Sequence, residues 1–149
     1  MNAKAALQDM FSTMLTKQWE QINDKIASLA EQFPEEKYEF SPVDGTRTFG
    51  GVLRHLAFWN QFVANSVRGI KTDETLNELP VHECPTKAQV VKALKKSADE
   101  ATAALKVRAE MEPASAELCA TFTQHSSEHY GQLVVYYRLS GLVPPASRA

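Results

Sequence analysis

Two histidines separated by three residues lie in the stretch TQHSSEHYGQLVVYY, residues 123–137. His125 and His129 belong to a mainly apolar series with steps of three or four residues, which places them on the packing face of a helix. Residues four apart in a helix are rotated by only about 40° and separated by a rise of about 6 Å, so both rings can point at one shared atom. Two buried imidazoles need partners for their ring nitrogens, and a divalent cation can serve both rings. The spacing therefore predicts a metal site.

A third histidine occupies a similar position in the stretch TFGGVLRHLAFWN. His55 lies one helical turn from Val52 and Trp59, at the edge of an apolar face. Inward-facing residues of two helices meet in the middle of a bundle, so His55 is the predicted third ligand beside His125 and His129. The alternative interpretation is that all three are hydrogen-bonded core histidines without a metal.

Other metal-site patterns fit the sequence less well. The di-iron bundle motif Glu-x-x-His is absent, because the residues three before the histidines are Val52, Phe122 and Ser126. The letters HSSEH match an inverted zinc-protease motif, with Glu128 as the general base. Glu128 lies about 100° around the helix from His129, so it is predicted to be solvated or to support the site without binding the metal. The pattern gives no support to a protease.

Several other residues have predicted roles near the site or away from it. We expect Trp59, Gln132 and Tyr136, together with Glu128, to line the pocket or to support the ligands. His82 and Cys84 are predicted to be exposed loop residues, with an approach of their loop to the site as the alternative. Cys119 is predicted to be a buried, inert thiol, and Arg54 and Arg138 to be surface charges.

Four amphipathic segments must position these residues. Apolar periodicity and capping signals predict helices from about Leu7 to Phe33, from Thr48 to Gly69, from Thr86 to Leu105 and from Pro113 to Leu139. No alternating strand pattern of useful length is present. The connection over residues 70–86 is longer than a tight turn requires. The sequence therefore predicts an all-α, up-down-down-up four-helix bundle with a long crossover between its second and third helices.

Length and composition restrict the class of protein. The chain has 149 residues, which fits a single domain over residues 1–149, and its net charge of −2 gives no reason to expect a nucleic-acid partner. No apolar run approaches the roughly 18 residues of a membrane span, and the first residues do not resemble a signal peptide. The two cysteines form no CxxC pair. We therefore expect a cytoplasmic protein with no membrane partner.

The two histidine-containing stretches resemble the DinB/YfiT-like family. The resemblance covers nearly the whole chain and is carried by TFGGVLRHLAFWN around His55 and by HSSEHYGQLVVYYRLSGLVPPAS from His125 onward. The family pattern is one histidine on the second helix and H-x-x-x-H on the fourth, and all three positions are histidine here. The resemblance implies a divalent metal, zinc or nickel first and iron or manganese as alternatives, and a homodimer. Several family members act on low-molecular-weight thiols, among them bacillithiol S-transferases and a mycothiol-dependent maleylpyruvate isomerase.

Two hypotheses about function follow. The first is a metal-dependent transferase or hydrolase, possessing a three-histidine site that activates a thiol or water toward a small electrophilic substrate. The second is a non-catalytic, stress-related bundle that binds a metal or ligand without turnover. Three neutral ligands leave the full charge on the ion and leave coordination positions open, as in catalytic sites. Whether the protein is an enzyme stays open at this point.

Overall fold

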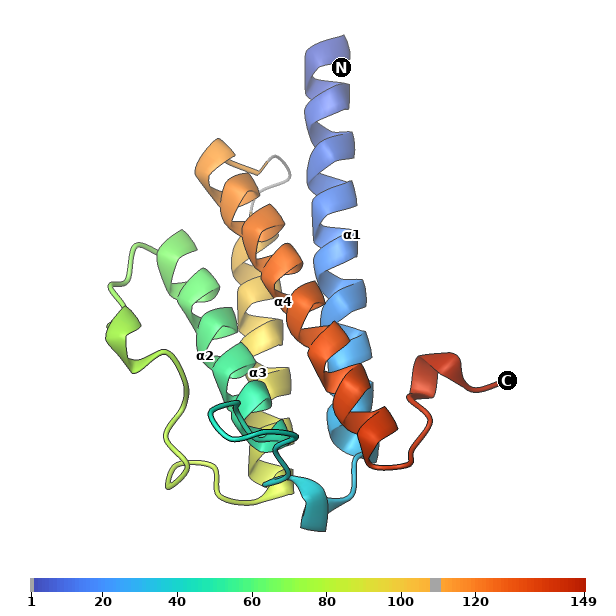
Figure 1. The fold of residues 1–149 in the computed structure, drawn as a ribbon. Helices are drawn as coiled ribbons and strands as arrows, with labels where there is room; N and C mark the ends of the chain where they lie inside the picture. The colour runs from blue at the N-terminus through green and yellow to red at the C-terminus, as the bar shows by residue number, and fades with distance from the viewer. Residues whose placement is uncertain (1, 108–110) are drawn as a thin grey trace.

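The computed structural model describes residues 2–107 and 111–149, and these residues form an all-helical chain (Figure 1). The four long helices are α1 (Ala3–Gln32), α2 (Phe49–Val67), α3 (Lys87–Leu105) and α4 (Pro113–Leu139). Three short 3-10 helices are η1 (Glu35–Lys37), η2 (Glu74–Leu76) and η3 (Pro145–Ser147). The described residues contain no strand. The predicted all-α class with four helices is confirmed.

The helix ends follow the local signals of the sequence. The Thr48 hydroxyl accepts a hydrogen bond from the Gly51 N–H at 3.0 Å and caps α2. Thr86 and Gln89 form a reciprocal capping box at the start of α3. Gly69 and Gly141 follow the C-caps of α2 and α4 with φ angles of +73° and +74°, which glycine adopts without strain. Short-range chemistry therefore sets where these helices begin and end.

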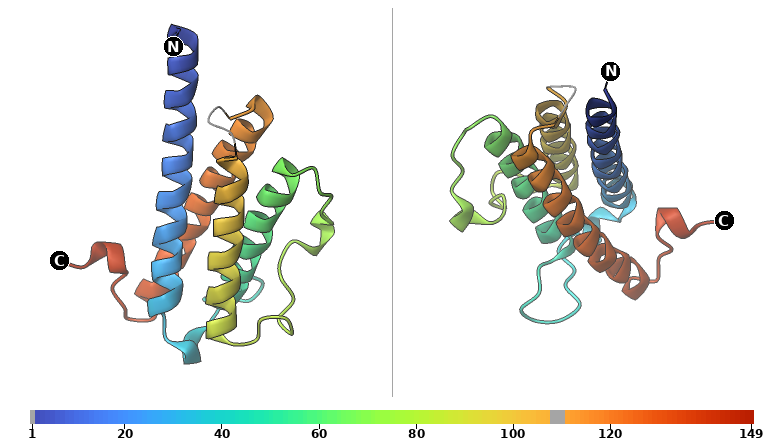
Figure 2. Two further views of the ribbon diagram at one scale, coloured as in Figure 1. Left: turned by 180° about the vertical axis from the view of Figure 1, so that it is seen from behind. Right: turned by 90° about the horizontal axis from the view of Figure 1, so that it is seen from above.

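The packing of the helices brings α2 and α4 together around the histidines. α1 packs against α3 and α4, and α2 packs against the same two helices. In Figure 1, α1 and α4 run downward, whereas α2 and α3 run upward. Figure 2 shows that the first turns of α1 project past the other helices and that residues 68–86 pass along the outside of α2. None of the described helices has the length and apolar character required to span a membrane.

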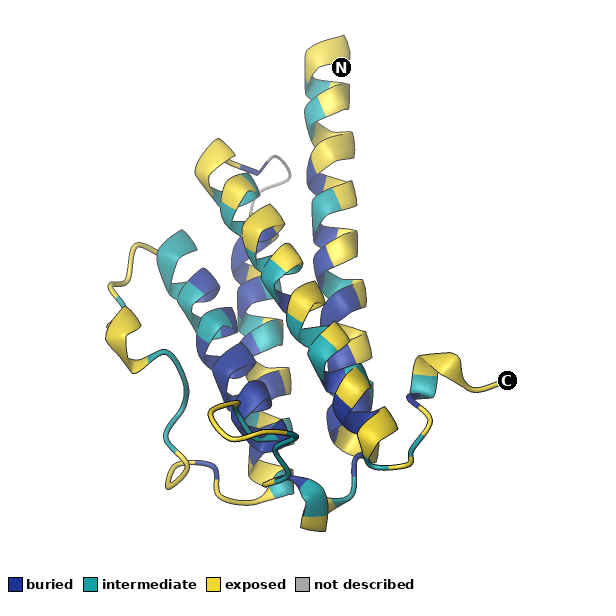
Figure 3. Ribbon diagram, viewed as in Figure 1, coloured by how far each residue is buried: buried dark blue, intermediate teal, exposed yellow. Residues whose placement is uncertain are grey.

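Two apolar clusters form the core, which Figure 3 shows as the inward faces of the helices. The larger cluster contains a group of rings in which Phe33 stacks on Phe49 with a centroid distance of 3.8 Å. The smaller cluster surrounds Trp19, whose indole N–H donates to the Thr102 hydroxyl at 3.0 Å. Burial of these aromatic side chains stabilises the core, because each removes a large apolar area from water.

The first half of α2 is buried on all sides, which corrects two predictions. Every residue from 49 to 58 is buried, because residues 33–48 and 68–86 cover the side of α2 that the other helices leave open. Arg54, predicted to be a surface charge, is only 3% exposed and pairs with Glu39 at 3.5 Å. Cys84, predicted to be exposed, is 3% exposed, because its loop folds back onto the larger cluster.

Two helical glycines provide a test of this packing. A Cβ atom on Gly50 would lie 3.2 Å from the backbone oxygen of Tyr38, which already accepts the Gly50 N–H at 2.7 Å. A Cβ atom on Gly131 would meet nothing within 4 Å. We therefore expect Gly50→Ala to lower the free energy of unfolding by about 1 kcal/mol, and Gly131→Ala to raise it by about 0.5–1 kcal/mol. Urea unfolding of both variants measures the difference, and equal effects would contradict the close approach at Gly50.

Candidate metal centre

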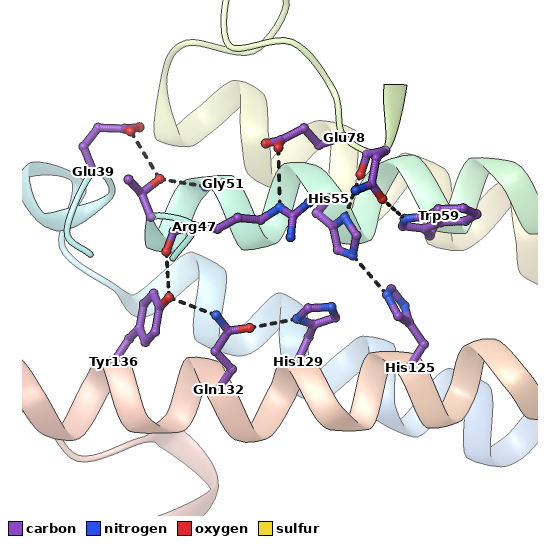
Figure 4. Close-up of polar contacts among 12 residues, drawn as sticks. Glu39, Arg47, Gly51, His55, Trp59, Glu78, His125, His129, Gln132 and Tyr136 are labelled. Atoms are coloured by element: carbon purple, nitrogen blue, oxygen red, sulfur yellow. Dashed lines mark hydrogen bonds and ion pairs between the residues drawn. The ribbon is translucent and has the colours of Figure 1, made fainter. Parts of the chain in front are cut away.

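Three histidine side chains from α2 and α4 converge in the bundle. One ring nitrogen from each of His55, His125 and His129 lies within 4.8 Å of the others. The Nε2 atoms of His55 and His125 are 3.0 Å apart (Figure 4). The structure thus brings together the three residues that the sequence predicted as ligands.

The crossover between α2 and α3 fixes the protonation of His55. The Nδ1 atom of His55 lies 2.6 Å from the backbone oxygen of Asn77. A carbonyl oxygen can only accept, so Nδ1 carries the proton and Nε2 keeps its lone pair. Asn77 adopts a left-handed conformation with φ of 57°, and its side-chain oxygen accepts the Trp59 indole N–H at 3.0 Å. One loop residue therefore orients both His55 and Trp59.

A chain of three hydrogen bonds fixes the protonation of His129. The Tyr136 hydroxyl donates its only proton to the backbone oxygen of Arg47 at 2.6 Å, so it must accept from the Gln132 amide at 2.9 Å. The Gln132 carbonyl oxygen then faces His129 Nδ1 at 2.8 Å and requires a proton there (Figure 4). In the neutral form of the ring, the Nε2 atom of His129 therefore keeps its lone pair.

His125 is the ring with an unsatisfied nitrogen. Its Nδ1 atom is buried and has no hydrogen-bond partner among the described residues. Its Nε2 atom faces His55 Nε2, which has a lone pair and no proton. Such an orphaned atom is uncommon in a folded protein. In the neutral, metal-free ring, the Nε2–H group of His125 donates to the Nε2 atom of His55. A cation between the rings would replace that proton and bind both Nε2 lone pairs, and Nδ1 of His125 would still have no partner among the described residues.

Burial keeps two of the rings neutral. Burial lowers the pKa of His55 to about 4, with smaller contributions from the charge of Arg47 and from His129, against the opposing hydrogen bond to Asn77. Burial also lowers the pKa of His125 to about 4, helped by the neighbouring histidines and Arg47. Neutral imidazole is the form that binds metals, so these two ligands need not lose a proton at pH 7.

The donor set fits a first-row divalent ion. Two nitrogens that bind one ion at about 2.1 Å can lie at most about 4.2 Å apart. The 3.0 Å contact between His55 and His125 is within this limit, and the 4.8 Å bound on the whole set exceeds it slightly. A pair of nitrogens at the 4.8 Å bound would therefore approach by about 0.6 Å to reach this limit, and by about 1.4 Å to reach the spacing of about 3.4 Å in a tetrahedral site. All three come from rigid helices, which favours this arrangement.

Three of the four supporting residues predicted from the sequence are linked to the histidines, and the fourth is exposed. Trp59, Gln132 and Tyr136 all take part in the hydrogen bonds around the histidines. Glu128 is exposed and accepts a hydrogen bond from Gln124 at 3.2 Å. Its negative charge raises the pKa of His125, but burial of the ring has the larger effect and lowers that pKa. Glu128 is therefore not positioned as the general base of a protease.

Three further predicted residues lie outside the cluster. His82 is exposed in the crossover. Cys84 and Cys119 are buried free thiols, and burial raises the pKa of both, that of Cys119 to about 11. Thiols with a raised pKa are poor nucleophiles and poor ligands at pH 7. The predicted burial of Cys119 is confirmed.

Sequence reasoning missed two residues of the site, Asn77 and Arg47. Asn77 holds His55, and the backbone oxygen of Arg47 receives the chain of bonds that begins at His129. Both lie in connections, where apolar periodicity carries no information. The only signal for Asn77 was its residue type, since asparagine tolerates the left-handed conformation better than other residues with a side chain.

Comparison with known proteins identifies the family of the chain. The sequence model of the DinB superfamily matches residues 18–133 of the chain, a range that includes all three histidines. A search of curated proteins found no significant match. The match covers well over half of the chain, and the chain belongs to the DinB superfamily.

The lowered pKa values predict an acid sensitivity of the metal-free protein. The folded-state pKa of His55 and His125, about 4, lies below the unfolded value of about 6.5. The neutral rings therefore stabilise the fold fully above pH 6.5, and this contribution is lost as the pH falls toward 4. We expect His125→Gln to show a shallower loss of unfolding free energy than the parent between about pH 7 and about pH 4.5.

Urea unfolding with a chelator present measures this pH dependence. His82→Gln is the matched control, because His82 is exposed, and its slope should equal that of the parent protein. Equal slopes in all three proteins would contradict the buried neutral state of His125.

Proposed function

We propose that this member of the DinB superfamily binds a divalent metal through His55, His125 and His129 and uses it as a transferase or hydrolase. The observation that carries the proposal is the orientation of the rings. Hydrogen bonds at Nδ1 of His55 and of neutral His129 direct the Nε2 lone pairs of these rings into the cluster, where the Nε2 atom of His125 also lies. Carbonyl partners on the far nitrogens of histidine ligands are typical of metal sites.

The chemistry follows from the charge of the donor set. When bound, a divalent ion supplies Lewis acidity that favours the deprotonated form of a thiol or water at neutral pH. Three neutral imidazoles do not reduce the charge of the ion, and Trp59 and Phe122, stacked at 5.5 Å, form an apolar wall beside His125. These features support activation of a small thiol, or of water, against an electrophilic substrate. Zinc or nickel is the proposed metal, with iron and manganese as alternatives.

The assembly and location are part of the same proposal. We propose the up-down-down-up helix order with residues 68–86 as the crossover, and the helix directions in Figure 1 support it. We also propose a cytoplasmic homodimer, by analogy with the family. Exposed apolar side chains in the first half of α1 support self-association; they are Leu7, Met10, Phe11 and Met14.

Metal analysis of protein purified without an affinity tag tests the site. We expect about one equivalent of metal in the parent protein and less than about 0.1 equivalent in His125→Ala, because two imidazoles hold an ion weakly. His82→Ala, which changes an exposed histidine outside the cluster, should keep the parent occupancy. A parent protein that stays metal-free after reconstitution with zinc and with nickel would refute the proposal.

Turnover separates the enzyme from the alternative, a non-catalytic, stress-related metal- or ligand-binding bundle. The metal-loaded parent protein is assayed with a panel of small thiols and electrophiles, with His125→Ala as the inactive reference. Product formation that is lost in His125→Ala supports the enzyme. Full metal occupancy without turnover on any pair favours the binding protein.

The hydrogen-bond chain to His129 predicts a role for a single hydroxyl group. Tyr136→Phe keeps the buried ring but removes the donor to Arg47 and the acceptor for Gln132, so Gln132 can rotate and release His129. We expect zinc affinity to fall by about tenfold or more, as for other residues that hold metal ligands in place.

Competition with a chromogenic zinc chelator measures that affinity. Tyr137→Phe is the matched control, because the Tyr137 hydroxyl is also buried but donates to the backbone oxygen of Leu29, away from the histidines. Equal zinc affinity in the two variants would show that the hydrogen bonds from Tyr136 through Gln132 do not position His129.

A further inference from the structure

A polar hollow lies beside the three histidines. It has a volume of about 590 Å³ and is lined by Gly45, Thr46, Arg47, Glu78 and Gln132. Gln132 also binds His129, so the hollow and the histidine cluster share a wall. The volume falls in the range of small-molecule sites, about 300–1,000 Å³. The hollow thus provides room for the part of a ligand that does not contact the metal.

Arg47 is the cation of this hollow, and its hydrogen-bonding capacity is unused. Its side chain extends toward His55 in Figure 4, and its charge contributes to the lowered pKa of His55 and His125. Its Nε atom is buried and pairs with Glu78 at 3.4 Å, but none of its side-chain N–H groups makes a hydrogen bond among the described residues. A guanidinium has five such donors, arranged to bind a carboxylate in a fork.

The backbone of Arg47 is fixed relative to the histidines. Its carbonyl oxygen accepts the Tyr136 hydroxyl, and the chain of bonds continues through Gln132 to His129. A fixed backbone anchors the base of the Arg47 side chain near the histidines, which limits the spacing of the groups by which one small molecule can reach both the guanidinium and a metal held by the histidines. Two anchor points of this kind select a molecule by the spacing of its functional groups.

The charges around the site favour an anion. A divalent ion held by three neutral rings keeps its full charge, and Arg47 adds another positive charge beside it. Glu78, which is 37% exposed, offsets only part of this charge. The contact between Arg47 and Glu78 already shows a carboxylate at the place that a ligand's carboxylate would take.

We propose that Arg47 recognises a carboxylate on the small molecule that binds the metal, and that Glu78 gives up its place on Arg47 when that molecule enters. This inference rests on the proposed metal site and names the substrate class for it, a small metal-binding molecule that carries a carboxylate a few bonds away. Arg47 is then a specificity-determining residue, and Glu78 is a competitor for the same guanidinium.

Binding of two small thiols to the cobalt-loaded protein tests this assignment. The probes are 3-mercaptopropionate, which carries a carboxylate, and 2-mercaptoethanol, which is neutral, and cobalt absorption in the visible and near-ultraviolet range reports binding of each. We expect Arg47→Gln to lower the ratio of the two affinities by about tenfold, the size of one charged hydrogen bond. Glu78→Gln should raise the ratio, because it frees the guanidinium. Differences in intrinsic thiol acidity cancel when the ratio is compared between variants.

The ion pair of Arg68 and Glu100 supplies matched controls. It lies elsewhere on the surface with a spacing of 3.7 Å and similar exposure, so Arg68→Gln and Glu100→Gln should leave the ratio unchanged. Cobalt binding with a ratio that neither Arg47→Gln nor Glu78→Gln changes would overturn the carboxylate site alone. Absence of cobalt binding by the parent protein would overturn the metal site and this inference together. If Arg47→Gln fails to fold, an unchanged ratio in Glu78→Gln overturns the inference.

Discussion

One hydrogen bond, from the Tyr136 hydroxyl to the backbone oxygen of Arg47, determines how His129 is oriented in the site. The hydroxyl has a single proton, and its use on a carbonyl decides the direction of every bond that follows, through Gln132 to His129. The same bond fixes the backbone of the residue whose guanidinium borders the histidines. A contact between α4 and the loop before α2 thus sets the position of a proton in one ring and anchors the backbone of the residue that carries the charge beside another.

The second constraint is the complete burial of the first half of α2. Buried polar side chains need hydrogen-bond or ion-pair partners. In this half of α2, Arg54 pairs with Glu39, and His55 binds Asn77 and faces His125. The two connections that cover α2 supply Glu39 and Asn77. The connections therefore do more than join helices, because they provide the polar partners that let a charged residue and an imidazole lie in the interior.

The sequence predicted the elements that depend on local signals. Apolar periodicity, the Thr86 capping box and the positions of Gly69 and Gly141 predicted four helices, and the placement of three histidines on two packing faces predicted their convergence. The exposure of Arg54 and Cys84 was predicted incorrectly, because burial there depends on how the connections fold back. Asn77 and Arg47 were missed for the same reason: their roles arise from tertiary contacts between loops and helices, which no spacing rule describes.

The left-handed Asn77 gives the site a thermodynamic link to a distant part of the chain. Its carbonyl oxygen reaches back over 22 residues to His55, so the loop must close before that ring is oriented. Ordering a loop of this length carries an entropic cost that contacts at its middle help to offset. By reciprocity, whatever binds the oriented ring also holds the loop closed, and whatever releases the loop weakens that binding by the same free energy. The histidine cluster and the crossover are therefore one cooperative unit, although they lie in different elements of the fold.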